Sequence, residues 1–184
     1  MKSIREIGTS NKGQALVELT LLSPLLLLLA YGSIEVGNVI STYITLTHTT
    51  REGANLASRG TAINVMLDAI TAAAAPTLRD DNSSHWKLIY SKVVQDPGVP
   101  CAQAPCVYKV ASQTERGGMG QSSKLGPVNQ TVTLDGINSV GPGQTFHVVE
   151  VFYDYQSVIL TFVGSDVDST IYDRTVFTNV SSAG

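Results

Sequence analysis

The stretch "NKGQALVELTLLSPLLLLLAYGSIEVGN", residues Asn11 to Asn38, is strongly apolar over most of its length and decides the fold of the chain. As a helix, its apolar part, Leu16–Gly37, would be about 33 Å long at 1.5 Å per residue. That length is enough to cross a hydrocarbon core of about 30 Å. One carboxylate, Glu18, stands near the start of the segment, although lipid-facing helices normally exclude acids. The stretch therefore predicts a membrane-spanning helix. The presence of Glu18 in that helix indicates a specific role for this residue.

The residues before this segment are mostly polar and carry a positive charge. Lys2, Arg5 and Lys12 stand against a single acid, Glu6. Because positively charged flanks stay on the cytoplasmic side, they predict a cytoplasmic amino terminus and an exported carboxy terminus. The whole chain has 184 residues and a net charge of −3, and it lacks the basic stripe that binds nucleic acid. We therefore expect a membrane partner and no nucleic acid.

A cleaved secretory signal peptide is the alternative interpretation of the apolar segment. Ala30-Tyr31-Gly32 would serve as its small-x-small cleavage site. However, apolar and small side chains continue beyond this site at spacings of three and four residues, as on one face of a helix. They are Val36, Val39, Ile40, Tyr43, Leu46, Thr50, Ala54 and Ala57. This continuation favours a permanent anchor over a signal peptide.

The remainder of the chain reads as one further helix followed by strands. Gly60 interrupts the first helical pattern, and an amphipathic helix is predicted over Thr61–Ala75, with Pro76 closing it. Beyond it, runs of β-forming residues separated by turn signals predict strands. The predicted strands are Trp86–Val94, Val107–Ala111, Thr131–Leu134, Thr145–Tyr155 and Ile171–Val180.

The strand Thr145–Tyr155 has apolar side chains on both faces, which predicts a central position in the sheet.

The sequence thus predicts an α+β, pilin-like fold: a long amino-terminal transmembrane helix carrying a small head with a second helix and an antiparallel sheet. The expected divisions are a leader (1–13), a transmembrane helix (14–38), an extended amphipathic helical region (39–75) and an exported sheet domain (76–184).

The opening stretch also resembles a known family of pilus proteins. "KG" followed by "QALVEL" is similar to the signature that prepilin peptidases cut, which places cleavage between Gly13 and Gln14, with Glu18 fifth after the cut. Together with "IEVG" at 34–37 and "REGA" at 51–54, the segment resembles the TadE-like minor pilins of the tight-adherence (Tad) pilus system. "VVEVFYDYQ" and "DRTVF" near the carboxy terminus are similar to strands of that family.

This resemblance implies a bacterial inner-membrane precursor that a prepilin peptidase processes. It implies as partners the major pilin, other minor pilins or pseudopilins, and the inner-membrane assembly platform. Glu18 would then pair with the new amino group of Gln14, on the same or a neighbouring subunit, during assembly. The alternative is an acid at a helix start, favoured there by the helix dipole. Glu35, at the outer end of the span, is a second candidate for assembly, and it could equally reach water.

The two cysteines, Cys101 and Cys106, lie in the exported part, where thiols become oxidised. The four residues between them do not fit a C-x-x-C redox motif, and further metal ligands are missing. Closing so short a loop would stabilise the fold by roughly 2 kcal/mol. We predict a structural disulfide between them.

Other polar residues do not predict a catalytic or metal centre. His48, His85 and His147 are scattered, and Asp166 and Asp168 lack the remaining oxygen ligands of an EF-hand. No serine has the G-x-S-x-G context of a hydrolase. We therefore expect no enzyme activity, no cofactor and no metal.

A short apolar run, Ser157–Gly164, belongs to a buried strand edge or to a surface that faces a partner or the membrane. The resemblance to TadE-like proteins implies a minor pilin or pseudopilin that takes part in assembly, priming or the tip of a Tad-type pilus and in adhesion. The alternative is a membrane-anchored exported binding module that does not polymerise.

Overall fold

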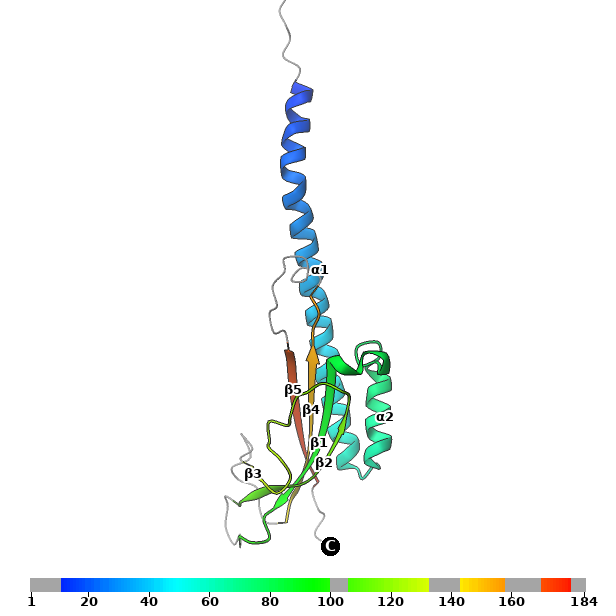
Figure 1. Cartoon of the computed structure of the whole chain (residues 1–184), viewed down its shortest axis with the longest axis vertical. Coiled ribbons are helices and arrows are strands. Elements are labelled where there is room, and N and C mark those ends of the chain that lie inside the picture. The colour runs from blue at the N-terminus through cyan, green and yellow to red at the C-terminus, as the bar shows by residue number, and fades with distance from the viewer. Residues whose placement is uncertain (1–10, 100–105, 133–142, 158–169, 180–184) are drawn as a thin grey trace, which may run out of the picture.

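The structure is a computed structural model that describes residues 11–99, 106–132, 143–157 and 170–179. One long helix carries a head made of a second helix and a five-stranded antiparallel sheet (Figure 1). This arrangement confirms the predicted α+β fold class. The residue boundaries of the four expected divisions stay a prediction.

The long helix, α1, extends without a break from Asn11 to Ser58 and includes Pro24. Its amino-terminal half projects beyond the head, whereas its carboxy-terminal half lies along the sheet (Figure 1). The helix ends at Ser58, and Gly60 reverses the chain two residues later with a φ of 83°, in the left-handed region that glycine adopts easily. There the Thr61 amide donates to the Leu56 carbonyl at 3.2 Å, a pattern that commonly closes helices.

The remaining elements follow the predicted order. Helix α2 covers Ile63–Ala73, and a short 3₁₀ helix, η1, covers Asp80–His85. The strands are β1 (Trp86–Gln95), β2 (Tyr108–Arg116), β3 (Thr131–Val132), β4 (Thr145–Asp154) and β5 (Thr170–Asn179). The sheet order is β3-β2-β1-β4-β5.

The largest differences from the sequence-based expectation concern β2 and η1, and α2 is two residues shorter at each end than predicted. The strand β2 continues to Arg116, five residues past its predicted end, and η1 was not predicted. The predicted ends of two strands, Leu134 and Val180, lie outside the described residues. As predicted, β4 is central: it pairs with β1 on one side and with β5 on the other.

Helices α1 and α2 cover one face of the sheet and form the larger core with it. The odd-numbered residues Val149 and Val151 of β4 face these helices, because side chains alternate along a strand. This core consists of Leu46, Ala54, Ala57, Met66, Leu67, Ile70, Ala74, Leu78, Trp86, Leu88, Tyr90, Val149 and Val151.

The opposite face of the sheet is covered by the chain that follows β2 instead of by a helix. Backbone hydrogen bonds fasten this connection to the sheet, with the Asn129 amide donating to the Val110 carbonyl at 2.8 Å and the Val110 amide donating to the Gln130 carbonyl at 3.0 Å. The second core lies beneath it and consists of Val93, Tyr108, Val110, Leu125, Val132, Phe146 and Val148.

Candidate assembly segment and its contacts with the head

The amino-terminal half of α1 is a bare apolar surface. Between Gly13 and Ile34 only Ser23 and Gly32 are partly covered, and Leu21 is 73% exposed. Among the described residues, α1 is the one helix that is long and apolar enough to cross a membrane. Its exposed side chains therefore suit lipid or the helices of other molecules, as expected for a single-pass anchor.

The predicted processing residues lie at the beginning of this surface. Gly13 is exposed, and no heavy atom outside its immediate chain neighbourhood lies within 4 Å of the position that a Cβ would take. The Gln14 amide group donates a 3.1 Å hydrogen bond to the Glu18 carboxylate one turn later. The structure thus brings Gln14 and Glu18 together on an accessible part of the helix.

Among the described residues, Glu35 is the first acid of α1 after Glu18, and it contacts the head. It is half-buried and accepts a hydrogen bond from the hydroxyl of Tyr155, which follows β4. Burial and the neighbouring Glu35 carboxylate raise the pKa of Tyr155. The sequence drew attention to Glu35 but gave no signal for Tyr155, because the two residues are 120 positions apart and belong to different predicted elements.

The carboxy-terminal half of α1 is packed closely against the sheet. Gly53 is buried, and a Cβ placed there would lie 2.9 Å from Ile70 Cδ1 and 3.4 Å from Val149 Cγ2. The fully buried Thr50 hydroxyl contacts Asp173 and lies 3.0 Å from the Thr175 hydroxyl, both on β5. Small residues and one polar cluster thus fix this half of the helix to the sheet.

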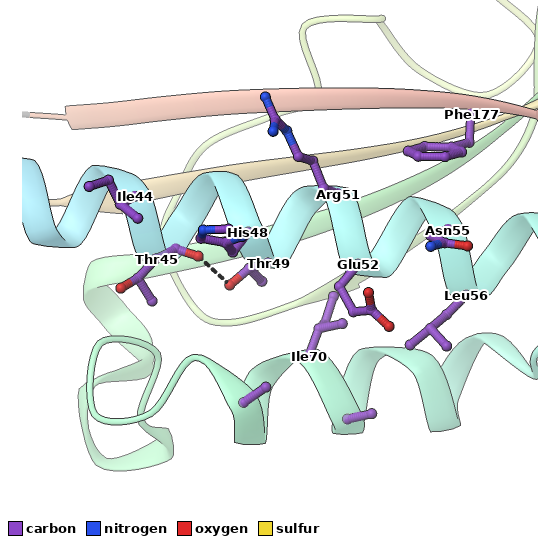
Figure 2. Close-up of a pocket in the computed structure, with 12 residues that line it drawn as sticks. Ile44, Thr45, His48, Thr49, Arg51, Glu52, Asn55, Leu56, Ile70 and Phe177 are labelled. Atoms are coloured by element: carbon purple, nitrogen blue, oxygen red, sulfur yellow. Dashed lines mark hydrogen bonds between the residues drawn. The ribbon is translucent and has the colours of Figure 1, made fainter.

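An open groove of about 680 Å³ follows the outer side of α1 next to α2. Figure 2 shows Glu52 and Leu56 on the side of α2, and Arg51 and Phe177 toward β5. The exposed His48 also lines the groove. In the part of the chain that the structure describes, no three His, Cys, Asp or Glu side chains converge as metal ligands.

A buried carboxylate that the sequence did not point out fastens the connection after β2. Glu150 is fully buried and accepts hydrogen bonds from the Tyr172 hydroxyl at 2.8 Å, the Lys124 amide at 3.1 Å and the Ser123 hydroxyl. The Lys124 ammonium group lies 3.5 Å from the Tyr172 ring centroid. Burial and the Glu150 carboxylate raise the pKa of Tyr172. These contacts fasten the connection after β2 to strands β4 and β5.

Two further histidines lie in the head. His147 is buried on β4, and its Nδ1 atom is 2.8 Å from the Tyr90 hydroxyl. Burial, together with the nearby Lys92, lowers the pKa of His147, and burial raises the pKa of Tyr90 to about 12. His85 lies near the surface, with Nδ1 3.2 Å from the Asp154 carboxylate. Each histidine therefore has a different environment, and the structure does not bring them together.

Several predicted residues lie wholly or partly beyond the described ranges. Cys106 packs against the second core, but Cys101 is outside the described residues, so their disulfide stays a prediction. Asp166 and Asp168 are also outside. Of the apolar run Ser157–Gly164 only Ser157 is described, and it is buried.

Residues 13–55 match a family model described as TadE-like protein. This segment is TadE-like. The TadE-like match starts at Gly13 and includes Glu18, Glu35 and Gly53, so it covers both the exposed half of α1 and most of the half that packs on the sheet. The TadE-like family is associated with the Tad pilus. No curated protein and no solved structure matches the chain significantly.

Proposed function

We propose that the chain is a minor pilin or pseudopilin of a Tad-type pilus, with a structural and not an enzymatic role. A prepilin peptidase cuts the inner-membrane precursor between Gly13 and Gln14, and the exported head takes part in assembly, priming or the tip of the pilus and in adhesion. The observation that carries this proposal is the TadE-like match, which begins at Gly13 on an exposed apolar helix.

The exposed half of α1 supports assembly because leucine side chains alone give neighbouring helices no preferred register. Lipid tails are as apolar as leucine, so helices gain little by leaving lipid for one another. A directional contact is needed, and Glu18 provides it by facing the amino group of Gln14 on a neighbouring subunit. The exposed position of both residues is compatible with such a contact.

A second surface on α1 supports a protein partner outside the bilayer. The span from Gln14 to Ile34 is about 31 Å long at 1.5 Å per residue, which already matches a hydrocarbon core of about 30 Å. Beyond it, Val36, Ile40 and Tyr43 are 59%, 53% and 49% exposed. Exposed apolar side chains in a row mark interaction surfaces. We assign this surface to a helix of the major pilin or of another minor pilin.

Processing is tested by mass spectrometry of the mature amino terminus in cells that carry the Tad system. We expect the mature chain to begin at Gln14, and we expect Gly13→Leu to leave the precursor in the membrane. A chain that begins at Ser33 would mean that an ordinary signal peptidase cuts it after Gly32, and the proposal would be wrong.

Assembly is tested separately with Glu18→Ala and Glu18→Gln. Both variants should be cut and remain stable, but should be strongly depleted from sheared pilus fractions, because a neighbouring amino group loses its partner. Glu52→Gln, which changes an exposed acid on the same helix, is the matched control and should be incorporated normally. If all three variants reach the pilus fraction at the level of the unmodified protein, Glu18 has no role in assembly.

A further inference from the structure

The bond that the proposed peptidase cuts lies inside a helix. Helix α1 begins at Asn11, so the peptide bond between Gly13 and Gln14 belongs to its first turn. In an α-helix the Gly13 carbonyl accepts a hydrogen bond from the amide four residues later, that of Val17. Proteolysis acts on locally opened chain, because a closed helical turn keeps its peptide bonds in hydrogen-bonded geometry. Cleavage therefore requires the first turn of α1 to unwind.

Several features make this turn easy to open. The first four amides of a helix have no acceptor inside it, so fewer hydrogen bonds hold the first turn than a central one. The turn carries no acid to interact with the positive end of the helix dipole, and Lys12 has the charge that is unfavourable there. Gly13 weakens the turn further, because glycine loses the most backbone freedom in a helix. Three destabilising features thus coincide at the turn that contains the cut.

The chain directly after the cut is held more firmly. The Gln14 side chain donates a 3.1 Å hydrogen bond to the Glu18 carboxylate, and a contact at this spacing stabilises a helix. From Leu16 onward the helix is mostly apolar and suits lipid, where an unpaired backbone amide or carbonyl is costly. Opening of the helix is therefore confined to the turn at the cut.

We propose that Gly13 is a hinge for processing. The prepilin peptidase acts on the fraction of chains in which the first turn of α1 is unwound, and the backbone freedom of Gly13 sets that fraction. Helices open and close within about 1 μs, far faster than a typical enzyme turns over at about 10 s⁻¹. Under these conditions the cleavage rate follows the population of the open state. This inference rests on the proposed cleavage after Gly13 and adds the conformation in which the peptidase takes its substrate.

The test measures initial cleavage rates of the full chain in detergent micelles with a purified prepilin peptidase. Gly13→Ala fits the helix, because no heavy atom outside the immediate chain neighbourhood lies within 4 Å of the added Cβ. Alanine favours the helix over glycine, so we expect cleavage to become about five-fold slower. Adding Ala15→Gly, at an exposed position on the other side of the cut, should restore the rate. Ala30→Gly makes the same change at an exposed position far from the cut and should restore nothing.

A second readout follows the helix without the peptidase. Hydrogen exchange of the Val17 amide, measured by NMR in the same micelles, should become several-fold slower in Gly13→Ala and recover when Ala15→Gly is added. Slow cleavage that persists in the double variant, although its amide exchange has recovered, would mean that the peptidase reads the glycine itself and would overturn the hinge. Cleavage of Gly13→Ala at the unmodified rate would also overturn it. An unmodified chain that is not cut after Gly13 would instead refute the proposed processing, and the hinge with it.

Discussion

The two halves of α1 belong to one unbroken helix but differ in almost every other respect. The amino-terminal half is rich in leucines that nothing in the described chain covers, whereas the carboxy-terminal half buries Gly53, Ala54 and Ala57 against the sheet. Small residues let a helix approach a sheet closely, and large apolar residues provide area for lipid or for partner helices. One continuous helix thus has a half that suits lipid or partner helices and a half that packs on the sheet. The size of the side chains distinguishes the two halves.

Glycine substitution is the strongest test of this contrast. Gly53→Leu inserts a side chain where a Cβ alone would lie 2.9 Å from Ile70 Cδ1, so we expect a loss of about 3 kcal/mol of unfolding free energy from overpacking. Gly37→Leu is the matched control, because no atom would contact its Cβ. Urea unfolding in detergent, followed by Trp86 emission, measures both. Similar losses in the two variants would mean that the halves do not differ in packing.

Threonine substitution sharpens the contrast for polar groups. Thr50 bonds to Asp173 and Thr175 across the interface between α1 and β5, whereas the Thr20 hydroxyl donates to Leu16 in its own helix at 2.8 Å. Thr50→Val should cost about 2 kcal/mol because it leaves the Asp173 carboxylate without this partner. Thr20→Val should leave head stability unchanged in the same unfolding experiment. A loss in Thr20→Val as large as that in Thr50→Val would contradict the assignment.

The smallest expected effect concerns pH and compares a buried with an exposed histidine. Burial lowers the pKa of His147, so the unfolded chain takes up a proton near its ordinary pKa of about 6.5 before the folded chain does. Stability should therefore fall as the pH drops through this range. His147→Gln should reduce the change in melting temperature between about pH 7.5 and about pH 5.5. His48→Gln, at an exposed site, should not, and an equal reduction would refute the prediction.

The sequence was sufficient to predict the elements whose pattern is local and apolar. The continuation of α1 past Gly37 followed from apolar spacing, and the central position of β4 followed from apolar side chains on both of its faces. The second half of β2, Ser112–Arg116, has no such pattern. Its residues are polar and owe their strand conformation to pairing with β1, which a single-sequence pattern does not reveal.

The contacts that fix the head could not be predicted for a related reason. Glu150 receives its hydrogen bonds from Ser123 and Tyr172, more than twenty residues away on either side, and Glu35 receives its bond from Tyr155. A buried acid and a solvated acid look alike in a sequence, because only the tertiary partners distinguish them. Gly13 and Glu18 could be proposed from the sequence because the motif that contains them is short and local.

The alignment of β4 and β5 with α1 has a mechanical consequence (Figure 1). A force applied along the α1 axis would act parallel to these strands, while the hydrogen bonds of an antiparallel ladder are perpendicular to them. The ten residue pairs between β4 and β5 would then share the load at the same time instead of opening one after another. When the chain is pulled along α1, the β4–β5 pair would therefore be loaded in shear. Breaking its hydrogen bonds one after another would require a force perpendicular to the strands.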